Sequence, residues 1–411
     1  MNVLIQLSHP AHFHLYKIVA QNLMIDGHQV LFVIKSKDIL ETLLQNAGLP
    51  YVNINQHAHR GSKLGILWDM LVREWRIVQL CRKHKIDLLT GSTPEVAHVS
   101  WVLHKYGVNT GEDDAAVVPM FGKIAGAFVL CLLTPDCCNN GKKESKSSKY
   151  PGYHELAYLH PNHFEANAEV VKGYGMEKRV NGEGMNGEQN PFAPYFILRF
   201  ASLNAHHDSG IKGINTEVAS RLIEILKPHG RIYITSERPL EPQFEQYRIK
   251  INPLDMHHVM AFASLYIGDS QTMAAEAGVL GVPFVRFNDF VGRIGYLREL
   301  EDVYQLGSGI HATPLPADSP IRKADGSTQP SGVEALYEVV ERLVGHKGER
   351  LSVSGEREHF DALRSEWAKR RERMLREKID CAKFLTWFIE NYPQSVAETR
   401  KADKVFWEKF K

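Results

Sequence analysis

Apolar and polar segments at the start of the chain alternate in an order that strongly limits the possible folds. Residues 2–7 (NVLIQL) are typical of a short buried strand, residues 13–25 carry the apolar spacing of a helix, and residues 29–34 (QVLFVI) are a second apolar strand. A strand, a helix and a strand in so short a stretch form a βαβ unit, whose strands are parallel and whose crossover is right-handed. The sequence therefore predicts a parallel sheet covered by helices.

This alternation continues to about residue 133 and resumes between residues 195 and 287. Residues 139–150 are rich in Lys and Ser and are expected to form a polar surface loop, and residues 178–194, with three Gly and two Pro, are expected to be a linker. The fold class is thus expected to be α/β, with two Rossmann-like parallel-sheet domains facing a cleft, plus C-terminal helices. The expected segments are an N-terminal domain (1–177), the linker (178–194), a C-terminal domain (195–345) and a helical tail (346–411).

The charge balance and the cysteines indicate which binding partners and which cellular compartment to expect. The chain has 49 Lys plus Arg and 48 Asp plus Glu, a formal net charge of +1, whereas a dedicated nucleic-acid binder carries a basic excess or stripe. The five cysteines lack paired spacing, and no secretory leader follows Met1, so a cytoplasmic location is expected. The apolar run at residues 124–133 is too short to span a bilayer. No nucleic-acid partner is expected.

Two alternatives describe the tail. Residues 349–378 are charged with a helical period, and residues 384–392 (FLTWFIENY) are apolar and aromatic. The first alternative is a solvated helix followed by a helix docked on the body of the protein. In the second, basic residues 369–371 together with Trp387 and Phe388 touch anionic lipid. Contact with a membrane surface therefore stays open.

A loop with several polar residues follows the expected strand at residues 265–267. Asp269, Ser270 or Thr272 can cap the helix that begins there, and Gln271 belongs to the same loop. A capped helix N-terminus binds phosphate through its unpaired N–H groups and its dipole, and Glu276, one turn further on, can point a carboxylate at a ribose diol. The alternative is a capped helix without a ligand.

The loop and its helix (GDSQTMAAEAGVLGVP, residues 268–283) resemble the donor-site signature of the glycosyltransferase-B superfamily and of the related UDP-N-acetylglucosamine 2-epimerases. Residues 10–33 (PAHFHLYKIVAQNLMIDGHQVLFV) are similar to the N-terminal pattern of nucleotide-sugar glycosyltransferases. With residues 158–161 and 199–208, these segments resemble an uncharacterised bacterial and archaeal family, a domain of unknown function beside those enzymes. The resemblance covers roughly the first 310 residues and implies the glycosyltransferase-B fold, with an acceptor-side N-terminal domain and a C-terminal domain that binds the nucleotide-sugar.

In the N-terminal half, the resemblance implies catalytic roles. His12 falls where many inverting glycosyltransferases of this fold keep a general base, and imidazole suits that task because its pKa lies near working pH. Asp113 is the first choice for the carboxylate that orients it, and Glu112 is the other candidate on the same loop. The structural alternatives are that His12 caps its helix and that the acids form a solvated turn. No metal is expected, although His9, His12 and His14 are closely spaced, because no further ligand stands nearby at metal spacing.

In the C-terminal half, the resemblance implies that Arg199 and His206 contact the diphosphate, since Arg offers phosphate a bidentate fork. The 2-epimerases have a tight His-Arg-x-x-Asn element near this place. Here Arg199 precedes His206 by seven residues, a departure that argues against epimerase chemistry.

The leading functional hypothesis is a nucleotide-sugar-dependent glycosyltransferase-like enzyme, with a cell-surface polysaccharide or glycoconjugate pathway implied by the resemblance alone. A UDP-sugar or other nucleotide-sugar would be the donor substrate, and a sugar or lipid-linked sugar the acceptor, with no tightly bound cofactor. The alternatives are a UDP-N-acetylglucosamine 2-epimerase-like enzyme and a non-catalytic nucleotide-sugar-binding protein. No Walker motif or dinucleotide-type Gly-rich turn is present, so kinases and dehydrogenases are not favoured.

Overall fold

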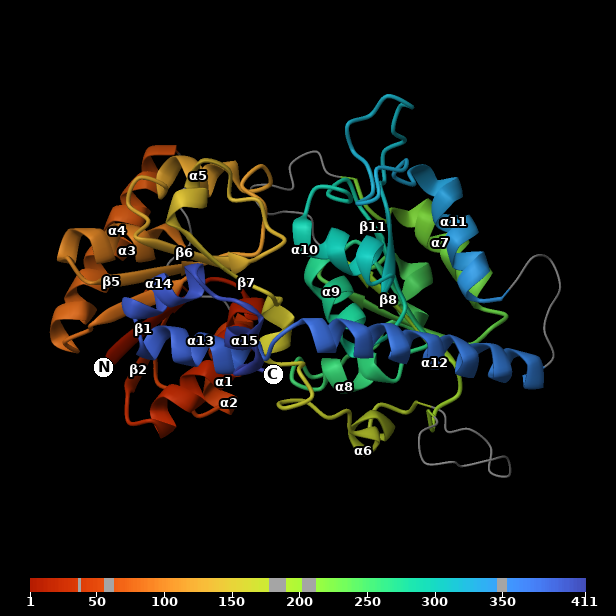
Figure 1. Cartoon of the computed structure of the whole chain (residues 1–411). Coiled ribbons are helices and arrows are strands. Elements are labelled where there is room, and N and C mark those ends of the chain that lie inside the picture. Colours follow the sequence, from red (N-terminus) through yellow and green to blue (C-terminus); the bar gives the residue numbers. More distant parts are fainter. Residues whose placement is uncertain (36–37, 55–62, 177–189, 202–211, 346–352) are drawn as a thin grey trace. The chain divides into compact units, whose positions relative to one another are not determined.

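Seven strands form a parallel sheet in the N-terminal part of the chain (Figure 1). The computed structural model describes residues 1–35, 38–54, 63–176, 190–201, 212–345 and 353–411. The strand order is β3-β2-β1-β4-β5-β6-β7, and every neighbouring pair is parallel. The strands are β1 (Asn2–Leu7), β2 (Gln29–Ile34), β3 (Tyr51–Asn53), β4 (Leu88–Gly91), β5 (Tyr106–Thr110), β6 (Cys131–Pro135) and β7 (Ser147–Tyr150).

Helices cover both faces of this sheet, as expected for parallel strands with continuous apolar sequences. Helices α1 and α13 pack together on one face, and α3 and α4 pack together on the other (Figure 1). The α-helices are α1 (Pro10–Ile25), α2 (Asp38–Asn46), α3 (Lys63–Lys83), α4 (Pro94–Leu103), α5 (Pro119–Ile124), α13 (Cys381–Glu390), α14 (Gln394–Arg400) and α15 (Lys404–Glu408). Two 3₁₀ turns, η1 (Gly141–Lys146) and η2 (His154–Ala157), flank β7.

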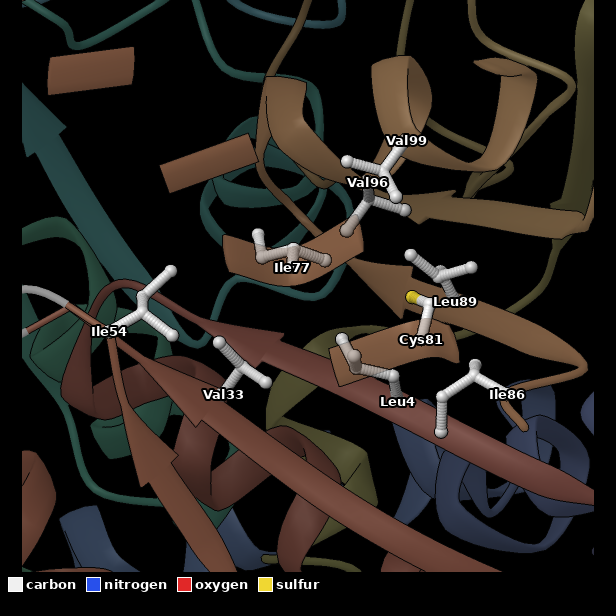
Figure 2. Close-up of a cluster of buried hydrophobic side chains, with 9 residues drawn as sticks. All are labelled: Leu4, Val33, Ile54, Ile77, Cys81, Ile86, Leu89, Val96 and Val99. Carbon is white, nitrogen blue, oxygen red and sulfur yellow. The ribbon is translucent and has the colours of Figure 1, made fainter. Parts of the chain in front are cut away.

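Figure 2 shows the core between this sheet and its α3–α4 layer. Nine buried side chains meet there: Leu4, Val33, Ile54, Ile77, Cys81, Ile86, Leu89, Val96 and Val99. They come from strands β1, β2 and β4, from helices α3 and α4, and from residues next to β3 and β4. Burial of this apolar surface holds the helices on the sheet, and the carboxyl ends of the strands are held in place with them.

A second parallel sheet contains five strands in the order β12-β11-β10-β8-β9. Helices α7 and α11 pack together, as do α8 and α9, on opposite sides of the strands (Figure 1). The strands are β8 (Tyr195–Phe200), β9 (Arg231–Ser236), β10 (Leu265–Gly268), β11 (Phe284–Phe287) and β12 (Gly307–Ile310). The α-helices are α6 (Ala168–Lys172), α7 (Thr216–Leu226), α8 (Met256–Ala261), α9 (Gln271–Leu280), α10 (Gly295–Arg298), α11 (Gly332–Leu343) and α12 (Val353–Glu377), with shorter turns η3 (Pro242–Tyr247) and η4 (Glu299–Val303). The predicted α/β fold with two parallel sheets is confirmed.

Contacts divide the chain into two units that each contain one sheet. The first unit is Met1–His163 with Glu377–Lys411, and the second unit is Phe164–Arg376. The expected helical tail is therefore shared between them: most of α12 belongs to the second unit, and everything after it belongs to the first. Residues 177–189, most of the expected linker, lie outside the described residues.

The prediction of a surface loop at residues 139–150 is wrong for its second half. Ser147–Tyr150 forms β7, an edge strand that pairs with β6, and Ser148 and Tyr150 are fully buried. Helix α14 covers this strand, and Arg400 donates from Nε to the Ser147 carbonyl oxygen at 3.2 Å. The contacts that bury β7 thus come from the C-terminal end of the chain. The sequence of β7 is rich in Ser and Lys and lacks the alternation of apolar residues by which a strand is predicted.

The aromatic part of the tail is docked, as the first alternative expects. In α13 Phe384 and Phe388 are fully buried, and the Asn22 amide of α1 donates to Thr386 at 3.3 Å. Two residues of the lipid-binding alternative make contacts within the protein instead: Phe388 is fully buried, and the guanidinium of Arg371 donates to the Val279 carbonyl oxygen. No helix among the described residues has the length and apolar character that crossing a membrane requires.

Candidate functional site

Both sheets reverse their strand order at a defined point. In the first sheet the order reverses between β1 and β4, and in the second between β8 and β10. In open α/β sheets, ligands bind beyond the carboxyl ends of the strands at such a reversal, because the loops there diverge to opposite faces. The loops after β1 and β10 lead into α1 and α9, whose first turns hold His12, Gln271 and Thr272, with Ser270 as the cap of α9.

In the second unit, the loop after β10 leads into the N-terminus of α9. Of the three possible caps, Ser270 is the one used: its hydroxyl accepts from the Met273 N–H at 3.4 Å. Gln271 and Thr272 form the first turn, where backbone N–H groups have no partner within the helix. The helix ends at Gly281, whose φ of +77° suits glycine as the left-handed C-cap. These free donors and the helix dipole favour an anion at this end of α9.

Asp269 has a structural role rather than a capping one. Its carboxylate is buried and accepts from the Ala201 N–H at 2.6 Å and from the Ile214 N–H at 3.3 Å. Burial raises the pKa of Asp269 to about 6, although both of these backbone donors lower it. Asp269 thereby ties the end of β8 and the approach to α7 to the end of β10.

Arg199 lies at the carboxyl end of β8, next to Gly268 in the strand pairing. A Cβ on Gly268 would approach the Arg199 Cβ to 2.9 Å, so glycine is needed for the two strand ends to lie this close. One Arg199 Nη atom pairs with Glu237, whereas the buried Nε has no hydrogen-bond partner among the described residues. Arg199 thus stands on the strand adjacent to the Ser270 loop with an unsatisfied buried donor. His206, its expected companion, lies outside the described residues.

Glu276 lies inside α9, with its side chain nearly fully buried. Its Oε1 lies 2.9 Å from Nε2 of His257, a buried residue of α8. The pair fixes the direction of the Glu276 carboxylate. Its contact with a ribose remains a prediction.

In the first unit, helix α1 begins at Pro10, three residues earlier than predicted. The cap is His9, whose Nδ1 accepts from the Ala11 N–H at 3.2 Å, and His12 lies in the first helical turn. The alternative in which His12 caps the helix is therefore wrong. Nδ1 of His12 lies 3.4 Å from both the backbone nitrogen and the hydroxyl of Ser8, which orients the imidazole at the end of β1.

The expected pKa of His12 needs correction. The pKa of His12 is lowered to about 3, chiefly by burial and to a smaller extent by electrostatic interaction with His9, His154 and Lys35. The imidazole is therefore neutral at physiological pH and is a weaker base than an ordinary histidine. Among the described contacts, neither a hydrogen bond nor an ion pair joins His12 to Asp113, its expected partner.

Asp113 and Glu112 follow β5, and the carboxyl group of Asp113 has an unusual affinity for its proton. Burial raises the pKa of Asp113 to about 7, and the neighbouring charge of Glu112 raises it too, while His154 acts in the opposite sense. The carboxylate of Glu112 is paired with His154 instead: its Oε2 lies 3.1 Å from Nδ1 of His154. The two adjacent acids therefore have distinct environments.

His154, on the η2 turn after β7, is a functional candidate that the sequence analysis missed. Its side chain is 9% exposed, and its buried Nε2 has no hydrogen-bond partner among the described residues. Electrostatic interaction with His154 is among the causes that lower the pKa of His12 and of Asp113. No sequence signal marked it, since η2 follows the strand that was mistaken for a loop.

Protein-family models and curated proteins gave no match to this sequence, but solved structures did. S. aureus MnaA in its co-structure with UDP aligns over 97% of this chain and 98% of its own, with a TM-score of 0.58 and 11% identity. A Listeria monocytogenes protein assigned as a UDP-N-acetylglucosamine 2-epimerase aligns over 96% and 97%, with a TM-score of 0.57 and 11% identity. The spinosyn forosaminyltransferase SpnP aligns over 97% and 100%, with a TM-score of 0.56 and 14% identity. The chain therefore has the two-sheet α/β fold found in sugar-nucleotide epimerases and glycosyltransferases of the glycosyltransferase-B type.

Proposed function

We propose that the chain is a nucleotide-sugar-dependent enzyme, and that it transfers the sugar to an acceptor hydroxyl. The observation that carries the proposal is the pairing of two anion-binding features at the strand-order reversal of the second sheet. The Ser270-capped N-terminus of α9 offers unpaired N–H groups, and Arg199 on the adjacent strand end offers a buried donor without a partner. Both features suit a diphosphate. The likeness of fold to MnaA, which was solved with UDP, supports the same class of ligand.

The second unit would then hold the donor. The diphosphate would contact Ser270, Gln271 and Thr272 at the start of α9, together with Arg199, and His206 is proposed as a further contact. Glu276, oriented by His257, would accept a hydrogen bond from the ribose. As the sugar leaves, negative charge grows on the departing phosphate oxygen, and fixed donors stabilise that charge without having to reorganise.

The first unit would supply the proton chemistry. The acceptor oxygen forms a bond to the anomeric carbon, the bond from that carbon to the diphosphate breaks, and the hydroxyl proton must be taken up. Asp113 suits this step better than His12, because a carboxyl group with a pKa of about 7 is an effective base near neutral pH. His12, neutral at that pH, would position the hydroxyl by hydrogen bonding, and Glu112 would hold His154 beside them. The pathway, assembly of a surface polysaccharide or glycoconjugate, is proposed from the sequence resemblance alone.

One observation favours an epimerase-like alternative. Glu112 and Asp113 are adjacent carboxyl groups with different environments, and such a pair can remove and return a proton at a sugar carbon. Incubation with UDP-N-acetylglucosamine in deuterated water separates the reactions. Ring deuteration without an acceptor indicates epimerisation, whereas acceptor-dependent release of UDP without deuteration indicates transfer. UDP binding with neither product indicates a non-catalytic binding protein.

Replacement of Arg199 by alanine tests the donor site. Loss of charge-assisted hydrogen bonds to phosphate costs about 1.5–3 kcal/mol, so the Kd for UDP should rise by roughly 10- to 100-fold. Arg231→Ala is the matched control, because Arg231 is exposed at the opposite, amino end of the same sheet. Calorimetric titration with UDP measures both variants. Unchanged affinity in Arg199→Ala, or equal losses in the two variants, contradicts the assignment.

A further inference from the structure

The outer surface of the α3–α5 layer in the first unit exposes large apolar side chains. In α3 Trp68, Leu71 and Trp75 are 58%, 49% and 62% exposed. Trp101 and Val102 of α4 are 50% and 58% exposed, and Met120 of α5 is 55% exposed. These six residues define what we call the α3–α5 face. Single exposed apolar residues are common on protein surfaces. Here, however, three of the chain's six tryptophans are exposed on neighbouring helices, and an apolar patch of this kind is typical of an interaction surface.

The α3 residues form one continuous stripe along their helix. Trp68, Leu71 and Trp75 are spaced by three and four residues, which places them on one side of an α-helix. Ile77 and Cys81 point the other way, into the core that Figure 2 shows. The helix is therefore anchored by one apolar side while a second apolar side faces outward.

Side-chain contacts hold α3, α4 and the segment that follows α5 next to one another. Glu74 of α3 lies 2.5 Å from Nδ1 of His98 in α4, and the His98 ring packs against Phe128, with ring centroids 4.8 Å apart. Trp101, one turn after His98, packs edge-on against the same Phe128 at 5.2 Å. Helices α3, α4 and α5 lie on the same side of the sheet in Figure 1.

The charges on these elements are unbalanced in favour of cations. Arg82 and Lys83 at the end of α3, Lys123 in α5 and Lys142 in the adjoining η1 turn are exposed. The carboxylates of Glu74 and Glu95 are paired with His98 and Arg73, and Glu144 of η1 is paired with Lys149. Asp69 is the other acid of these elements.

We infer that the α3–α5 face binds the surface of an anionic lipid bilayer. Tryptophan side chains favour the interface between headgroups and acyl chains, and each Lys or Arg near an anionic membrane contributes about 1 kcal/mol. A second copy of this chain fits less well, because a symmetric dimer places the same patch, with its cations, against itself. The inference rests on the exposed side chains and does not depend on the proposed reaction.

Binding to vesicles of phosphatidylcholine with about one third phosphatidylglycerol tests the inference. Tryptophan emission should shift to the blue, brominated lipid should quench it, and high salt should weaken binding because it screens the charges. The double variant Trp68→Ser/Trp75→Ser should bind at least ~10-fold more weakly, since it loses more than about 1.4 kcal/mol of apolar burial. Arg82→Gln/Lys83→Gln should bind about 30-fold more weakly, since it loses about 2 kcal/mol.

Ile25→Ser is the matched control, because Ile25 is 81% exposed at the end of α1, on the opposite face of the sheet. Its binding should equal that of the wild-type chain, and circular dichroism should show all variants folded. Absence of binding by the wild-type chain, or an equal loss in Ile25→Ser, overturns the inference. So does a dimer in light scattering that the tryptophan variants dissociate while no vesicle binding occurs.

Discussion

Replacing Asp113 with asparagine is expected to slow turnover by about 100- to 10,000-fold and, at the same time, to stabilise the folded chain. The loss of rate follows from removal of the one carboxyl group in the cluster whose pKa, about 7, is matched to accepting a proton near neutral pH. The gain in stability follows from burial. The folded protein holds this carboxyl group where its charged form is disfavoured, and asparagine has no charge to bury.

The size of the stability gain in Asp113→Asn depends on pH. The pKa of Asp113 is about 7 in the folded chain and 3.8 for the unperturbed side chain, so the folded state binds the proton more tightly than the unfolded state does. Asp113 therefore leaves the free energy of unfolding unchanged below about pH 4. Between about pH 4 and pH 7 it lowers that free energy progressively, and above about pH 7 the loss is complete. The variant should match the wild type near pH 4 and exceed it by up to roughly 2 kcal/mol above neutrality, since partial exposure screens part of the effect.

Glu112→Gln is the companion variant for the rate. The charge of Glu112 raises the pKa of Asp113, so its removal should lower that pKa and move the acidic limb of the kcat/KM profile to lower pH. The profile is measured from about pH 5 to 9, beside urea unfolding of each variant. A fully active Asp113→Asn, or an acidic limb that stays in place in Glu112→Gln, contradicts the role given to this carboxyl group.

Replacing Glu301 with glutamine is expected to destabilise the second unit by about 3–5 kcal/mol. Arg286 of β11 is completely buried, and Glu301 accepts from its Nε at 2.8 Å and from one Nη atom at 3.1 Å. The variant leaves a buried guanidinium without its counter-charge. Unlike a change at Asp113, it acts on the sheet that carries the donor loop rather than on any proposed chemistry.

Two further variants test whether the loss of stability in Glu301→Gln arises from leaving a buried charge without its partner. Glu372→Gln removes an exposed partner of Arg376 on α12, at 3.0 Å, and should cost less than about 0.5 kcal/mol. Arg286→Met/Glu301→Met replaces both buried charges and should be much closer to the wild type than Glu301→Gln alone. The free energy of unfolding in urea measures all three. Similar costs for the buried and the exposed pair show that Arg286 and Glu301 do not stabilise β11 as described.

The strands were predictable where local pattern and tertiary structure agree. The bounds of β1 and β2 match the apolar segments, because parallel strands buried on both faces need continuous apolar side chains. Strand β7 was missed because α14, more than two hundred residues later, supplies its cover. Helix α12 was expected to be solvated, yet Trp367 is buried and donates from Nε1 to the Leu306 carbonyl oxygen at 2.7 Å, a contact that its charged sequence conceals.

In the candidate site, the helix cap was predictable from the sequence, whereas the pKa values of the candidate residues were not. The cap at Ser270 follows from residue type and position, since a serine before a helix satisfies its free N–H groups. The low pKa of His12 and the high pKa of Asp113 could not be predicted, because they depend on burial by segments remote in sequence. His154 was missed because it follows β7, which the sequence did not reveal as a strand.

The central claim, that a diphosphate binds at the start of α9, is tested most directly by amide hydrogen exchange with and without UDP. Exchange should slow in the peptides covering residues 195–201 and 268–276 and stay unchanged in α11, residues 332–343. The same rates at residues 268–276 with saturating UDP, or slowing confined to α11, would contradict the claim.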